Sequence, residues 1–132
     1  MADLRQIAQI VVLSHQLPIT WLLALARLGG VVWLEFDPQA GHEQAGRRPA
    51  LVISPAGYNG KTGLMVCCPM TTKIKGHPFE VLAEVDGVAS AVLSDQVKSL
   101  GWKMRRAKKK GTVSADDMVH VRAKIEPLMI IQ

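Results

Sequence analysis

The sequence has very little cysteine, and this scarcity excludes a fold held together by disulfides. Only two of the 132 residues are cysteines, and these are the neighbours Cys67 and Cys68. Consecutive side chains of a strand point to opposite faces, so the two thiols are not placed to pair with each other. A metal or redox site would need further Cys or His residues at suitable spacing. We therefore predict two small buried apolar side chains in a reducing compartment.

Long apolar runs are also missing. The N-terminal stretch of residues 1–28 carries only three charged residues around the apolar runs Ile10 to Leu13 and Trp21 to Ala26, with Pro18 between them. No uninterrupted run approaches the ~20 residues that a membrane span requires. A signal peptide is disfavoured because polar residues and Pro18 break its apolar region. We expect no membrane contact and a cytoplasmic location, with residues 1–28 as an amphipathic helix or a leader before the true domain start.

Common catalytic signatures are absent as well. The chain has no glycine loop of the kind that cradles phosphates, no zinc-type His/Cys cluster and no G-x-S-x-G elbow. Its four histidines, His15, His42, His77 and His120, are scattered, and no spacing forces two of them together. This weakens a two-histidine ribonuclease mechanism, and we expect surface or packing roles for them. No metal and no cofactor are predicted.

Positive charge is what the sequence has in excess. Sixteen Lys and Arg stand against eleven Asp and Glu, which gives a net charge of +5 and a pI near 9.5. A polyanion is then the first partner to consider. The densest run is Lys103 to Lys110, which could also be a solvated hairpin without a function. A phosphate backbone would suit it together with the other cations, which are Arg47, Arg48, Lys61, Lys73, Lys75 and Lys98.

Short segments rich in β-branched residues and bounded by Gly and Pro favour a single, mainly β domain with helices, a small barrel or sandwich. An Asn-Gly pair predicts a turn within Tyr58 to Gly63. The predicted strands are Val31 to Phe36, Pro49 to Ser54, Leu64 to Cys68, Phe79 to Ala83, Val88 to Leu93 and Gln96 to Trp102.

The clearest helix comes last. Ser114 can cap it, and Asp117 three residues later makes the pattern resemble a capping box. Apolar residues recur at spacings of three and four, and Pro127 should end or kink the helix near Glu126. The predicted apolar face consists of Met118, Val121, Ile125 and Leu128.

Two short segments could hold a reactive phosphate. Pro49 restricts the backbone directly after Arg48, and Gly46 allows the backbone before Arg48 more conformations. The planar guanidinium of arginine matches two phosphate oxygens and stays charged. Thr71 and Thr72 follow Pro69 in a predicted turn, where a hydroxyl could meet the same phosphate. From the residues alone, a surface ion pair for Arg48 and a turn role for Thr71 remain open.

Six segments of the chain share a pattern with a known family. They are Val31 to Pro38 (VVWLEFDP), Gly41 to Pro55, Pro69 to Thr72, Gly76 to Val81, Asp95 to Ser99 and Lys109 to Val113. In these segments, and in their order, the sequence resembles the MazF/PemK family of toxins. The resemblance runs from about Gly29 to Glu126. Residues 1–28 have no counterpart in the family. We therefore divide the chain into an N-terminal extension, 1–28, and an endoribonuclease domain, 29–132, and expect the extension to be dispensable for cleavage.

The resemblance implies an SH3-like small β-barrel with a C-terminal helix, of the MazF/PemK/CcdB type, that forms a homodimer. It implies a sequence-specific, metal-independent endoribonuclease that cuts single-stranded mRNA and inhibits growth. The neighbouring 2′-hydroxyl would attack, leaving a 2′,3′-cyclic phosphate and a 5′-hydroxyl. A cognate MazE-like antitoxin would neutralise the toxin, with DNA bound only through that complex. The alternative is a toxin of the same fold that poisons DNA gyrase by protein contact.

By position, Arg48 and Thr71 correspond to the catalytic pair of the family, and Glu43 is a supporting candidate. Arginine hardly deprotonates, so the general base stays unassigned. The sequence departs from its relatives at Gly30, His77 and Pro127. None of these changes removes the catalytic pair. The residues expected to bind RNA are Arg47, Lys61, Thr72, Lys73, Lys75, Gln96 and Lys98.

Overall fold

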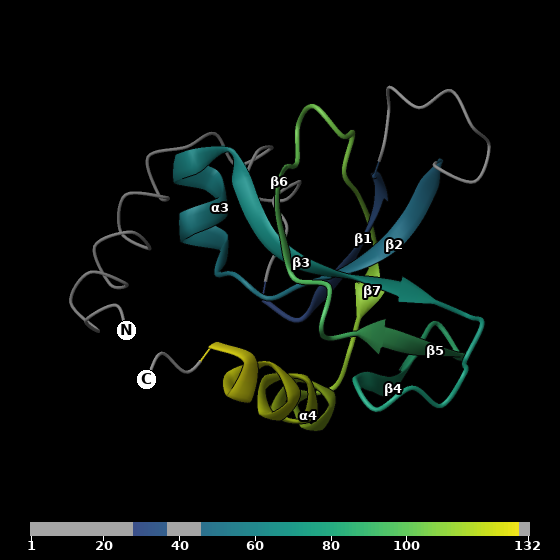
Figure 1. The fold of residues 1–132 in the computed structure, drawn as a ribbon. Helices are drawn as coiled ribbons and strands as arrows, with labels where there is room; N and C mark the ends of the chain where they lie inside the picture. The colour runs from purple at the N-terminus through teal and green to yellow at the C-terminus, as the bar shows by residue number, and fades with distance from the viewer. Residues whose placement is uncertain (1–27, 37–45, 130–132) are drawn as a thin grey trace.

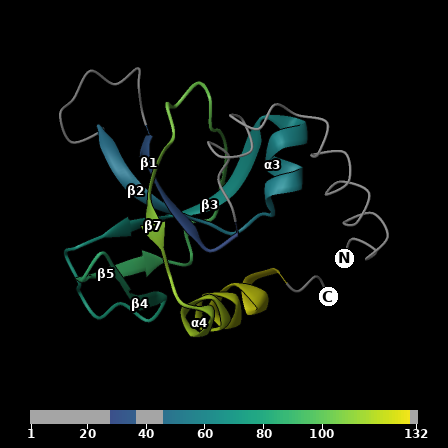
Figure 2. The same cartoon turned by 180° about the vertical axis from the view of Figure 1, so that it is seen from behind.

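The computed structural model describes residues 28–36 and 46–129, which form a curled antiparallel sheet with a helix at its C-terminal end (Figure 1). The strands are β1 (Gly30–Glu35), β2 (Arg47–Val52), β3 (Leu64–Thr71), β4 (Glu80–Val85), β5 (Val88–Leu93), β6 (Lys98–Gly101) and β7 (Lys108–Thr112). Their order is β4-β5-β3-β2-β1-β7, and β6 pairs with β3 off this path. Figure 2 shows the same curl from behind, with α4 (Ala115–Ile125) on one side of it. The predicted mainly β architecture with a C-terminal helix is confirmed.

The two faces of the sheet bury separate apolar cores, and the adjacent cysteines divide between them. Cys67 packs with Val32 and Met65, whereas Cys68 packs with Val31 and Leu51. Burial raises the pKa of the Cys67 thiol to about 11 and that of the Cys68 thiol to about 12. Both thiols are therefore protonated and unreactive near neutral pH. The prediction of two buried cysteines on opposite faces is confirmed.

The C-terminal helix begins as the sequence predicts. Ser114 Oγ accepts a hydrogen bond from the backbone N–H of Asp117 at 3.0 Å, and Val121 is 1% exposed against the sheet. The helix ends at Ile125 and continues as a 3₁₀ turn over Glu126–Met129, consistent with the break expected at Pro127. The prediction for Leu128 is wrong: the tighter turn changes its direction, and it stays 49% exposed.

The predicted Asn-Gly turn is wrong, because this segment is the helix α3 (Ala56–Thr62), which is followed by Gly63 as its C-cap with φ 72°. Asn59 is fully buried, and its side chain binds Ser54 twice. The Ser54 hydroxyl donates to Asn59 Oδ1 at 2.5 Å, and Asn59 Nδ2 donates to the Ser54 carbonyl at 3.2 Å. Trp102 Nε1 also donates to the Asn59 carbonyl at 2.8 Å. These tertiary bonds override the local preference of Asn-Gly for a turn.

Asn59→Ala is therefore expected to destabilise the fold by about 2–4 kcal/mol, because it removes both buried hydrogen bonds between the Asn59 side chain and Ser54. Lys61→Ala on the same helix is the control, since Lys61 is exposed and its loss should cost less than about 0.5 kcal/mol. Chemical denaturation of both variants measures the difference. Equal stability of the two variants would contradict the role given to Asn59.

Strand ends also differ from the prediction. β2 begins two residues before the predicted start at Pro49, because Arg47 and Arg48 pair with Glu35 and Leu34 of β1. β3 runs to Thr71 rather than Cys68, because its last residues pair with β5. β7 was not among the predicted strands, since its lysine-rich sequence has no apolar alternation. It is held by pairing with β1.

Candidate active site

The strand register brings Arg48 and Thr71 together. β2 and β3 are antiparallel, and their ladder pairs Ala50 with Pro69. Arg48 lies two residues before Ala50 and Thr71 two residues after Pro69, so both lie just beyond this pair, at the same end of the β2–β3 ladder. Both residues line one pocket of about 400 Å³. Twenty-three residues apart in sequence, they are thus neighbours in space.

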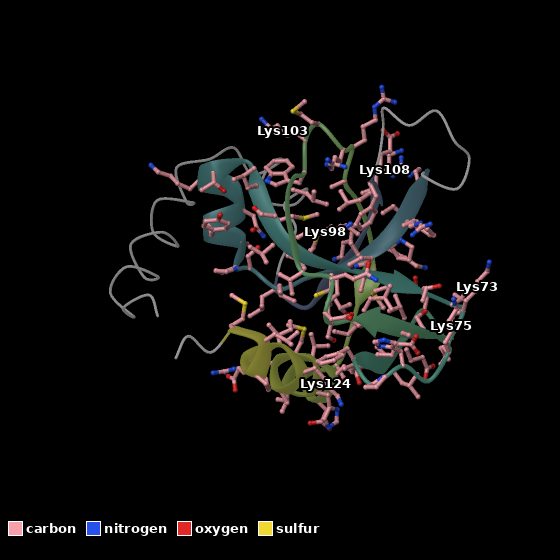
Figure 3. All side chains as sticks on the ribbon, viewed as in Figure 1. Lys73, Lys75, Lys98, Lys103, Lys108 and Lys124 are labelled. Carbon is pink, nitrogen blue, oxygen red and sulfur yellow. The ribbon has the colours of Figure 1, made fainter. Side chains whose placement is uncertain are left out.

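Half of the pocket lining consists of residues that the sequence singled out: Arg48, Thr71, Lys73, Lys75 and Gln96. The other half consists of Gly76, His77, Glu80, Leu93 and Asp95. Figure 3 shows Lys73 and Lys75 beyond the end of β3, beside the β4–β5 hairpin. Three permanent cations therefore face two carboxylates, and an anion with several oxygens suits this lining.

The Thr71 hydroxyl is oriented by the chain that follows it. Its Oγ1 accepts a hydrogen bond from the backbone N–H of Lys73 at 3.1 Å. A hydroxyl has one hydrogen to donate and two lone pairs. The bond to Lys73 engages a lone pair, so the hydrogen can be donated to a ligand in the pocket. Thr71 is half-buried, which lets a ligand reach it.

Glu80 shapes the turn that carries the pocket lysines. Its Oε1 accepts hydrogen bonds from the backbone N–H groups of Lys75, at 3.0 Å, and Gly76, at 2.9 Å. Gly76 has φ 75°, a conformation that suits glycine. The carboxylate is thus occupied by the turn's own backbone, and Lys73 and Lys75 are presented at the rim. Sequence reasoning gave Glu80 no role, although it lies in one of the matching family motifs.

His77 also lines the pocket, where the sequence predicted only a surface or packing role. Its Nδ1 accepts a hydrogen bond from the backbone N–H of Phe79 at 3.3 Å. The two rings lie 6.2 Å apart at a 40° tilt. In the neutral imidazole this contact leaves the proton on Nε2, so the ring offers one donor to a ligand. Only its departure from the family pattern had marked this position.

The other predicted residues that the structure describes lie outside the pocket lining. Arg47 Nη2 donates to the carbonyl of Arg106 at 3.3 Å, and Lys98 Nζ lies 5.6 Å from the centre of the Phe36 ring. Lys61 is exposed in the last turn of α3, and Thr72 is exposed just after β3. Figure 3 shows Lys98 at the centre of the view, away from Lys73 and Lys75. Glu43 lies outside the described residues.

The long basic run does not form one uniform patch. Lys103 Nζ lies 5.6 Å from the Trp102 ring centre, and Lys110 Nζ lies 4.8 Å from that of Trp33. Lys110 also approaches Asp86 at 3.8 Å. Two of these charges, those of Lys103 and Lys110, therefore lie against neighbouring side chains. Within residues 28–36 and 46–129, no three His, Cys, Asp or Glu side chains are grouped to hold a metal ion.

No helix in the described part of the chain has the length and apolar character needed to cross a membrane.

Comparison with known proteins identifies the family. The model of the PemK-like, MazF-like toxins of type II toxin–antitoxin systems matches residues 27–129. The endoribonuclease toxin MazF of Escherichia coli K12 is 51% identical over 105 residues, covering 77% of this chain and 92% of the relative. The Escherichia coli endoribonuclease PemK is 34% identical over 109 residues, covering 76% of this chain and 80% of that relative.

Solved structures of MazF proteins have the same fold as this chain. The crystal structure of MazF from Deinococcus radiodurans superposes with a TM-score of 0.71 at 52% identity, covering 80% of this chain and 96% of that one. A MazE–MazF complex from the same organism gives a TM-score of 0.70 at 44% identity, covering 82% of this chain and 98% of the matched one. The predicted fold type is confirmed, and the chain belongs to the PemK-like, MazF-like toxin family of type II toxin–antitoxin systems.

Proposed function

We propose that this chain is a toxin endoribonuclease that cleaves single-stranded RNA at the pocket containing Arg48 and Thr71. The observation that carries the proposal is the meeting of these two residues in a pocket rimmed by Lys73 and Lys75. Family membership and the endoribonuclease names of the relatives support it. The alternative of a gyrase poison finds no support in these relatives, and protein contact alone would not need an arginine and a hydroxyl directed at one phosphate.

The chemistry proposed for the pocket is transesterification. The ribose 2′-oxygen forms a bond to phosphorus while the bond from phosphorus to the 5′-oxygen breaks. The 2′-hydroxyl proton leaves to a base that stays unassigned, and the 5′-oxygen gains a proton. Negative charge grows on the non-bridging oxygens, where the Arg48 guanidinium and the Thr71 hydroxyl would stabilise it. Because the nucleophile already lies beside the phosphorus, no metal-bound water is required.

The other polar residues would guide the RNA strand. Lys73, Lys75 and Gln96 line the pocket itself and would contact the phosphates or bases beside the cleaved bond. Arg47, Lys61, Thr72 and Lys98 lie further out and would follow the backbone. Glu43 stays a proposed supporting catalytic residue.

We propose a second copy of this chain and an antitoxin as partners. An apolar depression of about 370 Å³, lined by residues that include Leu28, Ile53, Met118 and Val121, lies along α4. Val119, which also lines the depression, is 62% exposed. A homodimer would cover this face, and sedimentation equilibrium tests it: a monomer at all concentrations would exclude the dimer. The catalytic unit would be residues 29–132, acting in the cytoplasm.

The antitoxin proposal is supported by the MazE–MazF complexes of Deinococcus radiodurans that this chain resembles. An acidic, extended segment that mimics RNA phosphates would occupy the basic pocket. DNA would be bound only through that complex. Titration with the antitoxin should then stop RNA cleavage, and binding without inhibition would exclude this mode.

RNA affinity is expected to fall steeply with salt, because each lysine or arginine that contacts a phosphate releases a counterion. About four contacts would give a slope near −3 in a plot of log K against log salt concentration, roughly a fifty-fold loss between about 50 and 200 mM. Fluorescence anisotropy with a labelled oligonucleotide measures this slope. An affinity independent of salt would argue for a protein target.

The test of the proposed function is direct cleavage. Purified protein should cut RNA at short recurring sequences in the presence of excess EDTA, and sequencing the new 5′ ends identifies them. An intact RNA pool, together with binding to gyrase, would overturn the proposal in favour of the alternative toxin.

A further inference from the structure

The turn that joins β6 to β7 grips the end of strand β1. The guanidinium Nη1 of Arg105 donates to the carbonyl of Glu35 at 3.1 Å and also to the carbonyl of Phe36. In return, the backbone N–H of Glu35 donates to the Arg105 carbonyl at 3.0 Å. Side chain and main chain of one residue thus fix the point where the chain leaves β1.

The same turn also holds the start of strand β2. Arg47 Nη2 donates to the carbonyl of Arg106 at 3.3 Å. Arg47 pairs with Glu35 across the β1–β2 ladder, and Arg48 pairs with Leu34. The turn thus hydrogen-bonds both members of the Glu35–Arg47 pair. The next pair along the ladder contains Arg48.

The turn is itself a rigid support. Trp102, at its start, is 6% exposed and binds the Asn59 carbonyl through its indole N–H. The backbone N–H of Ala107, at its end, donates to the Trp102 carbonyl at 2.9 Å and closes the turn. Arg106 adopts φ 51°, which the closed turn imposes. The support therefore runs from α3 through the turn to the strand that carries Arg48.

The chemistry of the contact is specific to arginine. Arg105 gives its hydrogen bonds to two neutral carbonyls at the end of a strand, so a carboxylate is not what holds it there. A planar guanidinium presents several N–H groups in fixed directions, whereas a lysine ammonium on a flexible stem does not. Lysine would keep the charge and lose the fixed geometry.

We propose that Arg105 is a positioning residue for the cleavage reaction, fixing through Glu35 and the β1–β2 ladder the place of Arg48 relative to Thr71. This inference rests on the proposed function. A displacement of about 1 Å in a catalytic group can cost about 10²-fold in rate. Removing the grip should therefore slow the chemical step far more than it weakens RNA binding.

The test compares Arg105→Lys with Arg106→Asn. Arg105→Lys keeps the positive charge and loses the planar guanidinium with its fixed N–H directions. Arg106→Asn removes a charge from the adjacent residue, and asparagine tolerates the left-handed φ there. We measure the single-turnover cleavage rate at saturating protein, the affinity for an RNA with a 2′-deoxy scissile nucleotide, and the melting temperature. The amide hydrogen exchange of Glu35 measures how firmly the turn holds the end of β1, independently of RNA cleavage.

Arg105→Lys should cleave about 10- to 100-fold more slowly. Its affinity should stay within about two-fold, and exchange at Glu35 should become faster. Arg106→Asn should keep the wild-type cleavage rate. Arg105→Lys that cleaves at the wild-type rate, although exchange at Glu35 is faster, would overturn the positioning role. A cleavage rate that falls only near the melting temperature of the variant would overturn it too. Failure of the proposed function shows differently, because the wild-type protein would then not cleave RNA at all.

Discussion

Arg48→Ala is expected to fold normally and to cleave RNA about 10²–10³-fold more slowly than the wild-type protein, which is the usual cost of removing one donor that stabilises developing charge. Arg48 is exposed at the start of β2, so its truncation creates no cavity in the core. RNA binding should persist, because Lys73, Lys75 and Gln96 remain in the pocket. Single-turnover cleavage at saturating protein separates the lost rate from any lost affinity.

Thr71 extends this prediction and shows which property of each side chain matters. Thr71→Val removes the hydroxyl at nearly constant shape and should lose less activity than Arg48→Ala if its role is secondary. Thr71→Ser keeps the hydroxyl and should retain most of the rate. Lys124→Ala is the charge-matched control, since Lys124 is exposed on α4 and Figure 3 shows it far from Lys73 and Lys75. Wild-type cleavage by Arg48→Ala would overturn the mechanism.

The second large effect concerns the RNA. Replacing the ribose on the 5′ side of the cleaved bond by a 2′-deoxyribose should abolish cleavage, because it removes the internal nucleophile. Binding should stay nearly unchanged, since the phosphates that meet Lys73, Lys75 and Arg48 are still present. The same substitution one nucleotide away is the control and should be cut at close to the normal rate. Gel separation of end-labelled oligonucleotides measures the cleavage of the unmodified RNA, of the 2′-deoxy RNA and of the control RNA.

The ends of the fragments provide an independent measurement. Attack by the 2′-oxygen leaves a 5′-hydroxyl on the downstream fragment, which polynucleotide kinase should label without prior phosphatase treatment. Cleavage should also survive excess EDTA, because no metal-bound water acts as the nucleophile. Fragments that resist labelling until they are dephosphorylated, or cleavage of the 2′-deoxy substrate, would exclude this mechanism.

Local patterns in the sequence determined the class of fold and much of the site. Alternating β-branched residues and Gly and Pro boundaries placed six of the seven strands, since side-chain periodicity is a local property. The cap at Ser114 located the last helix for the same reason. Arg48 before Pro49 and Thr71 after Pro69 stood out by their neighbours in the chain alone, and the family resemblance gave them roles.

Only the tertiary structure decided the rest. The Asn59 segment became a helix because Ser54 and Trp102 supply its hydrogen bonds, and Trp102 lies 43 residues away in sequence. Arg105 grips a carbonyl 70 residues away, which no local pattern could indicate. Arg48 and Thr71 line one pocket because β2 and β3 pair, and His77, Glu80 and Asp95 join them because the β4–β5 hairpin pairs with the end of β3. The physical reason is that hydrogen bonds between distant segments form only when the whole chain has folded, so they cannot be predicted from short stretches of sequence.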